Sequence, residues 1–138
     1  MKAYVDSSVI LRFALGQPGL LEEWDQILLA VSSSLASVEC LRTLDRFRLA
    51  QGMGDPQIAA TRALILKALS RIRLVDPTRD VLTRASDPLP TALGTLDAIH
   101  LTTALQWQAS TGDRLVMATH DGALGMAARA CGMEVVGV

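Results

Sequence analysis

The sequence predicts an α/β protein in which helices cover both faces of a parallel sheet. Two observations support this prediction. Short apolar runs typical of strands alternate with longer segments in which apolar residues recur at helical spacing. The strand-like runs are apolar throughout, which is typical of strands buried on both faces. The chain of 138 residues is 50% hydrophobic, which is enough for one domain, residues 1–138, with its own core.

The first expected elements are a strand over residues 2–6 and a helix that begins at Ser7 or Ser8 and ends near Leu15. A glycine and a proline then stop this helix. A second helix is expected over apolar residues at helical spacing: Leu20, Leu21, Trp24, Ile27 and Leu28. We expect this apolar face to be buried in the core, with Trp24 partly at the edge of the core. The alternative is a groove that accepts a partner's helix.

A helical hairpin is expected in the middle of the chain. Residues 31–39 predict a short strand or turn that leads to a helix N-cap at Ser37, and this helix runs to about Gln51. Its predicted apolar stripe consists of Val38, Leu41, Leu44 and Phe47. The turn GMGDP follows, and Pro56 opens a helix that extends to about Ser70. Because the connection is short, the two helices are expected to pack antiparallel.

The second half of the chain continues the alternation of strands and helices. We expect strands over residues 72–77, 114–119 and 133–138, and helices over residues 78–86, 96–110 and 122–130. Residues 87–94 contain two prolines and are expected to form a loop.

Composition and charge narrow the class of protein. Cys40 and Cys131 have no CxxC or CxxH spacing, so we expect reduced core thiols in a cytoplasmic protein. Asp6 and Arg12 interrupt the N-terminal apolar stretch, which argues against a signal peptide or a membrane span. The net charge of −1 argues against generic polyanion binding. Residues 42–75 carry seven basic and two acidic side chains, a balance of +5 that is also typical of a solvated helical surface.

Four carboxylates are expected to converge at one edge of the sheet. Asp6 ends the first expected strand, and Asp121 lies just past the strand that ends in MAT. Glu39 and Asp97 stand near the starts of helices that leave the same edge. One acid in the first turn of a helix suits the helix dipole. Four together repel one another and require either raised pKa values or a compensating cation.

The chemistry of these side chains favours a hard cation. No Cys/His set is available for zinc, and carboxylate oxygens are the ligands that Mg²⁺ or Mn²⁺ prefers. A water on such an ion can serve as the nucleophile in phosphodiester hydrolysis. The sequence therefore predicts a metal-dependent hydrolase of nucleic acid.

Two arginines share the helix face of Glu39. At 100° per residue, Arg42 and Arg46 project within about 60° of Glu39. One interpretation is a local Glu39–Arg42 ion pair at i, i+3. The other is that both guanidinium groups bind phosphates of a nucleic acid beside a metal that cuts it.

Four segments resemble, in order and over nearly the whole chain, the PIN-domain ribonucleases, in particular the VapC-type toxins of bacterial and archaeal toxin–antitoxin pairs. They are YVDSSVI, SSLASVECLRTLDR, LDAIHLTTAL and ATHDGALGMAARACGMEVV. The resemblance implies a three-layer α/β/α sandwich with a central parallel five-stranded sheet, from which the helical hairpin protrudes. It implies an endoribonuclease that depends on Mg²⁺ or Mn²⁺ and hydrolyses RNA with a metal-activated water. It also implies a homodimer, and inhibition by a cognate antitoxin whose C-terminal segment fills the active-site groove.

By position, the acidic quartet of this family falls on Asp6, Glu39, Asp97 and Asp121. The resemblance implies that Asp6 and Asp97 bind the metal directly. It implies that Glu39 and Asp121 act directly or through metal-bound waters. Many relatives have a basic residue three positions before the third acid, where this chain has Gly94, so one phosphate contact is missing or comes from elsewhere.

Further side chains have supporting roles in this resemblance. The hydroxyl of Ser7 or Ser8 and that of Thr119 would steady the carboxylates by hydrogen bonds, although Thr119 equally suits a strand residue that caps the next turn. His100 is expected to make a structural hydrogen bond, with metal ligation as the alternative. His120 is expected to be an exposed turn residue, with a substrate contact as the alternative.

Phosphoryl-transfer enzymes and receiver domains also have an aspartate at the end of their first strand, as this chain has at Asp6. A dehalogenase-type phosphatase needs a second aspartate where this chain has Ser8, and a receiver domain needs a lysine at the end of a late strand, where none stands. The stronger rival is a non-catalytic PIN-fold module that binds RNA or a protein. A complete acidic quartet favours catalysis over such a module.

Overall fold

Five strands and six α-helices make up the structure, a computed structural model that describes residues 1–138. The strands are β1 (Lys2–Val5), β2 (Leu29–Ser33), β3 (Arg73–Val75), β4 (Val116–Ala118) and β5 (Val135–Val136). The helices are α1 (Ser7–Ala14), the short 3-10 helix η1 (Trp24–Gln26), α2 (Leu35–Gln51), α3 (Asp55–Leu69), α4 (Arg79–Ala85), α5 (Thr95–Thr111) and α6 (Gly122–Ala130). The strand order is β3-β2-β1-β4-β5, and every neighbouring pair is parallel. The prediction of a parallel five-stranded sheet is confirmed.

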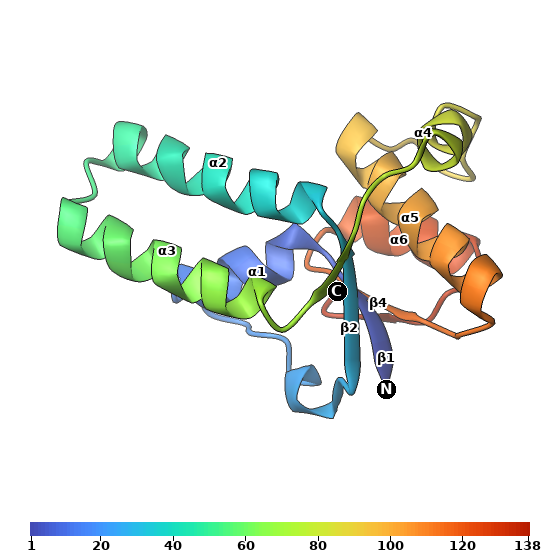
Figure 1. Ribbon diagram of the computed structural model, residues 1–138, viewed down its shortest axis with the longest axis horizontal. Helices are drawn as coiled ribbons and strands as arrows, with labels where there is room; N and C mark the ends of the chain where they lie inside the picture. Colours follow the sequence, from blue (N-terminus) through green and yellow to red (C-terminus); the bar gives the residue numbers. More distant parts are fainter.

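Helices cover both faces of this sheet, so the molecule has three layers (Figure 1). Successive side chains of a strand point to opposite faces. Ala3 and Val5 of β1 therefore pack with α1, α2 and α3, whereas Tyr4 packs on the other face with α5 and α6. Each face of the sheet thus has its own apolar core, which confirms the three-layer α/β/α sandwich.

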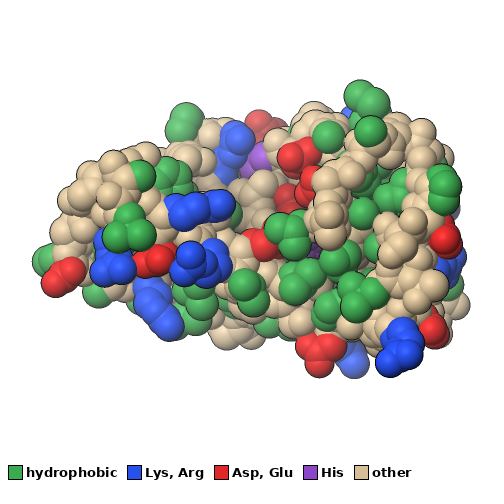
Figure 2. Space-filling view, turned by 90° about the horizontal axis from the view of Figure 1, so that it is seen from above, with side chains coloured by type: hydrophobic (Ala, Val, Ile, Leu, Met, Phe, Trp, Pro, Cys, Tyr) green, Lys and Arg blue, Asp and Glu red, His purple; other side chains and the backbone are tan.

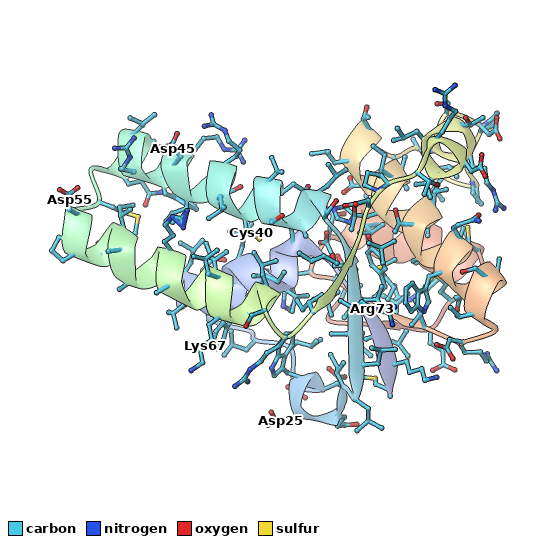
Figure 3. The ribbon with its side chains drawn as sticks, in the orientation of Figure 1. Asp25, Cys40, Asp45, Asp55, Lys67 and Arg73 are labelled. Carbon is cyan, nitrogen blue, oxygen red and sulfur yellow. The ribbon has the colours of Figure 1, made fainter.

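The helical hairpin, α2 and α3, packs antiparallel and projects beyond the edge of the sheet (Figure 1). Leu44 and Ile65 are buried where the hairpin joins the core. Figure 3 shows Asp45 and Asp55 toward the far end of the hairpin and Cys40 on its inner side. The predicted apolar stripe is only partly right, because Val38 is 56% exposed. The face of α2 that packs against α1 and α3 is a row at spacing four: Ala36, Cys40 and Leu44.

Residues 20–28 do not form the predicted helix. Only η1 is helical there, and the chain enters β2 at Leu29, which pairs with Lys2. Pairing with β1 and β3 satisfies the backbone hydrogen bonds of β2 and buries Val31. A helix in the exposed segment before it would stabilise the chain less, although the apolar residues there have helical spacing. Leu28 is 88% exposed, whereas Trp24 packs partly buried against the first core.

The other predicted elements exist, with different ends. Helix α2 begins at Leu35 after Ser34, and not after a cap at Ser37, whose hydroxyl donates instead to the Ser34 carbonyl at 2.6 Å. The last three strands are shorter than predicted. None of the helices combines the length and the apolar character needed to cross a bilayer.

The two cysteines are free, and only one is a core thiol. Cys40 is fully buried, and burial, followed by the charge of Glu39, raises its thiol pKa to about 12. Cys131 is half-buried at the end of α6, so the prediction that it is a core thiol is wrong.

We expect Leu44→Ala to lower the free energy of unfolding by about 2–5 kcal/mol, because it leaves a cavity where the hairpin joins the core. Leu49→Ala is the matched control, since it removes the same atoms from the same helix. Leu44 is 2% exposed and Leu49 is 73% exposed, so the control should change stability by less than about 0.5 kcal/mol. Urea unfolding measures both. A single unfolding transition is expected. Equal effects of the two substitutions would contradict the burial of Leu44 in the core, and separate melting of the hairpin would contradict the predicted single domain.

Candidate active site

The topology of the sheet brings two of the predicted acids to the carboxyl end of its central strand. Asp6 directly follows β1, and Asp121 begins α6 just after β4, the neighbour of β1. The order of the strands reverses between β1 and β4, and functional groups of open parallel sheets gather at such a point. Glu39 in the second turn of α2 and Asp97 in the first turn of α5 reach the same edge.

These four carboxylates, called the acid cluster below, are Asp6, Glu39, Asp97 and Asp121. Their proximity shows in the pKa of Asp97, which is raised above its usual value. Partial burial is the largest cause, followed by the charges of Asp121 and Asp6, with Glu39 adding to them and His100 opposing them. Figure 2 shows acidic side chains gathered in a hollow beside the hairpin, whose own surface carries basic side chains.

Asp6 is held in place by the two elements that flank it. It is 4% exposed and acts as the N-cap of α1, a role predicted for Ser7 or Ser8. Its Oδ2 accepts hydrogen bonds from the Ser8 hydroxyl at 2.5 Å, the Ser8 amide at 3.3 Å and the Thr119 hydroxyl at 3.0 Å. Only Ser7, at the limiting distance of 3.5 Å, contacts Oδ1.

Asp121 is joined to Asp6 through Thr119. The buried Thr119 hydroxyl donates to Asp6 and accepts from the Asp121 amide at 2.9 Å, so Thr119 supports the carboxylate and also caps the turn. Oδ1 of Asp121 accepts from the first amides of α6, those of Ala123 at 2.8 Å and Leu124 at 2.9 Å. Both predicted interpretations of Thr119 are therefore observed in one side chain.

Glu39 is held by a buried imidazole. His100 Nε2 lies 2.5 Å from Oε2 of Glu39, and His100 Nδ1 lies 2.8 Å from the Tyr4 hydroxyl. Burial, the largest influence, lowers the pKa of His100, but the hydrogen bond and charge of Glu39, with the charges of Asp6 and Asp97, leave it raised. Because both ring nitrogens have partners, His100 makes the expected structural hydrogen bonds.

Three members of the acid cluster thus have one oxygen engaged by the protein and one with little or no hydrogen bonding: Asp6, Glu39 and Asp121. Asp97 accepts no hydrogen bond from the protein. Carboxylate oxygens of this kind suit Mg²⁺ or Mn²⁺. No three acidic, histidine or cysteine side chains are arranged to hold one ion together. The donor set therefore fits an ion that takes one or two carboxylates and keeps several waters, as Mg²⁺ does.

Arg42 and Arg46 border a groove next to the acid cluster. The groove, of about 240 Å³, is lined by Ser7, Leu35, Val38, Glu39, Arg42, Thr43, Arg46 and Leu96. Arg42 pairs with Asp45 at 3.1 Å and Arg46 donates to Thr43 at 2.9 Å. The local Glu39–Arg42 pair is therefore absent, and both guanidinium groups lie exposed beside the site.

Sequence reasoning missed or misplaced three side chains near the acid cluster. Ser8, and not Ser7, makes the short bond to Asp6, and no sequence pattern singled out Tyr4, although a buried phenol requires a partner. His120 is half-buried and not an exposed turn residue, since its Nδ1 donates to the Gly137 carbonyl at 2.8 Å. Gly137 has a φ of +94°, and a Cβ there would lie 2.5 Å from the Thr119 carbonyl oxygen.

Known proteins resemble this chain in sequence and in fold. Residues 3–124 match the PIN domain family. Ribonuclease VapC46 of Mycobacterium tuberculosis is 33% identical over 140 aligned positions, which cover 96% of this chain and 95% of that protein. The crystal structure of VapC20 from the same organism, described as a sarcin-ricin loop cleaving toxin, has a TM-score of 0.58 and 18% identity over 98% of this chain and 99% of that one. At that identity the likeness concerns the fold alone. The chain therefore belongs to the PIN domain family and, within it, to the VapC-type proteins.

Proposed function

We propose that this protein is a divalent-metal-dependent endoribonuclease and the toxin of a toxin–antitoxin pair. The single observation that carries the proposal is the convergence of four carboxylates from four separate segments at the carboxyl edge of the sheet. Such a cluster repels itself, and this repulsion destabilises the fold unless a cation compensates it. Membership of a family whose relatives include a protein named as a ribonuclease supports the same activity.

Mg²⁺ or Mn²⁺ is the cofactor that we propose. Asp6 and Asp97 would hold the ion directly, and Glu39 and Asp121 would contact it directly or through water. When bound, the ion would supply Lewis-acid stabilisation of charge on the phosphate and lower the pKa of a water for attack on phosphorus.

The side chains of this chain have separate tasks in the proposed reaction. Hydrogen bonds from Ser8 and Thr119 to Oδ2 keep the Asp6 side chain from rotating. Its other oxygen, Oδ1, therefore keeps a fixed position at the end of β1. Glu39 and Asp121 each have an oxygen available to orient the attacking water and accept its proton. Arg42 and Arg46 bind phosphates of the RNA in the adjoining groove.

The rival function is a PIN-fold module that binds RNA or protein without cutting. It explains the basic groove, but it assigns no purpose to four acids that are costly to keep together. It also leaves the hydrogen bonds that immobilise Asp6 and Glu39 without a purpose.

A cognate antitoxin is the protein partner that we propose. An apolar groove of about 220 Å³ lies on the outer side of α1 and η1, lined by Val9, Ile10, Phe13, Leu20, Leu21, Glu22, Trp24, Asp25 and Ala68. Phe13 and Leu20 are 51% and 50% exposed and offer apolar surface to a partner, whereas Leu21 is buried and Trp24 packs against the first core, as predicted for this face. Glu22 and Asp25 make its border acidic, so a segment with apolar side chains beside basic ones would fit it. The homodimer and the cytoplasmic location stay predictions, and sedimentation equilibrium measures the first.

We expect Asp97→Asn to reduce RNA cleavage in Mn²⁺ by about a hundredfold or more, because a carboxylate that we propose as a direct ligand of the ion loses its charge. Asp113→Asn is the control, since Asp113 pairs with Lys2 at 2.5 Å, near the opposite edge of the sheet. Gel analysis of total cellular RNA, with the protein freed of any antitoxin, measures both rates. Equal cleavage by both variants would reject the site, and RNA binding without cleavage by the wild type would support the rival module.

We expect Arg42→Gln and Arg46→Gln to weaken RNA binding and to make it less sensitive to salt. The slope of log affinity against log salt should fall by about 0.7 for each phosphate of single-stranded RNA that the variant no longer neutralises. Arg48→Gln is the matched control, because Arg48 shares Asp45 with Arg42 but does not line the groove. Fluorescence anisotropy with the Asp97→Asn protein avoids cleavage during the titration. Equal slopes for all three variants would exclude this groove from the RNA path.

We expect Phe13→Glu to weaken antitoxin binding at least tenfold, because it places a charge in the apolar groove. Leu49→Glu on the exposed side of α2 is the control for a new surface charge. If a small reading frame immediately upstream of this gene encodes a DNA-binding protein, that protein is the partner to test, and calorimetry measures its affinity. Unchanged affinity of the Phe13→Glu protein would remove this groove from the interface.

A further inference from the structure

A continuous chain of buried hydrogen bonds connects strand β2 to the acid cluster. The Ser33 amide donates to the Tyr4 hydroxyl at 2.9 Å, and that oxygen lies 2.8 Å from His100 Nδ1. His100 Nε2 lies 2.5 Å from Glu39 Oε2. Tyr4 and His100 are both 0% exposed, so water does not compete for the bonds of the Tyr4 hydroxyl, whereas the bond to Glu39 is partly buried. The chain runs from β2 through β1 and α5 to α2, elements far apart in the sequence.

The direction of these bonds follows from the donors available. The Tyr4 oxygen accepts the Ser33 amide proton, and the Tyr4 hydroxyl and Nδ1 of His100 share one further hydrogen bond. Because a carboxylate oxygen only accepts, Nε2 of His100 carries a proton and donates it to Glu39. The ring is held edge-on to Tyr4, with an interplanar angle of 72°. Both ring nitrogens are thereby used, and the Nε2–H points at one oxygen of Glu39.

Without His100, Glu39 has another partner on its own helix. Arg42 lies one turn further along α2, on the same face and at the i, i+3 spacing that favours an ion pair. In the structure Arg42 instead pairs with Asp45. Glu39 is thus bonded to His100 and Arg42 to Asp45, and both side chains line the same groove without pairing with each other.

We propose that His100 is a positioning residue that keeps Glu39 within the acid cluster and apart from Arg42, with Tyr4 fixing the imidazole from behind. The proposal rests on the proposed function, because Glu39 matters only if the cluster holds a cation. His100 touches neither the substrate nor the ion in this role. It selects which oxygen of Glu39 is free.

The first test uses the metal-free protein and needs no activity. The Nε2–H of His100 should give a slowly exchanging, downfield proton signal in NMR, since it is buried and bonded to a carboxylate. The signal should disappear in Glu39→Ala and shift in Tyr4→Phe. If the signal is unchanged in Glu39→Ala, the bond is absent in solution and the proposal is overturned.

The second test measures Mn²⁺ affinity by calorimetry without RNA. His100→Leu removes the donor to Glu39 and should weaken binding by about 10- to 100-fold, whereas His100→Gln places an amide donor near the position of Nε2 and should restore most of the affinity. Thr102→Val, a buried change on the same helix outside the hydrogen-bond chain, should bind Mn²⁺ as the wild type does. Thermal unfolding of each variant confirms that the comparison concerns folded protein.

The outcomes separate this proposal from the proposed function. If the wild type binds Mn²⁺ and His100→Leu binds it equally well, the positioning role fails while the nuclease assignment stands. If His100→Gln is as weak as His100→Leu, packing of the imidazole and not its hydrogen bond is responsible, which also overturns the proposal. If the wild type binds no Mn²⁺, the proposed function fails and the role of His100 fails with it.

Discussion

Four carboxylates meet at the carboxyl end of the central strand, and their mutual repulsion constrains the structure around them. At a separation of about 4 Å, two such charges repel by about 4 kcal/mol where the effective dielectric constant is near 20. Partial burial, followed by the charges of Asp121 and Asp6, raises the pKa of Asp97. To keep the four carboxylates together, the fold must hold their side chains by hydrogen bonds that leave the negative charge in place. Hydroxyl, amide and imidazole donors do this, whereas arginine pairs would neutralise the cluster.

The supporting bonds come from both faces of the sheet. On one side, the Ser8 hydroxyl binds Asp6 and also accepts the His120 amide, which connects the start of α1 to the turn after β4. Across the sheet, His100 of α5 reaches Glu39 of α2. Each carboxylate so held has one oxygen assigned to the protein, and the other stays available. Asp97 alone accepts no such bond, which leaves it free to adapt to a ligand.

The hairpin places positive charge beside the acid cluster, but its arginines do not pair with the four carboxylates. Its arginines pair along α2 itself, with Asp45 accepting from both Arg42 and Arg48. Figure 3 shows Asp45 on the side of α2 away from α3, so these pairs lie on the outer surface of the hairpin. Exposed pairs of this kind contribute little to stability and exchange readily for another anion. The hairpin can therefore offer guanidinium groups to phosphates beside the carboxylates while the core of the fold stays unchanged.

The sequence alone determined the class of fold, because uniformly apolar strands are a local pattern that the parallel sheet uses directly. It also singled out the four acids, because two of them follow expected strands and two stand near the starts of helices that leave the same edge. It also located the hairpin, through a short turn and a proline in the first turn of α3. It misassigned residues 20–28, since helical spacing there is overridden by pairing of the next residues with β1. Only the tertiary structure decided that Ser8 makes the short bond to Asp6 while Ser7 makes a longer one, that Tyr4 and His100 hold Glu39, and that Arg42 turns to Asp45. Tyr4 and His100 are 96 positions apart in the chain, so no local pattern encodes their bond; hydrogen bonds between buried groups form only after packing has excluded water.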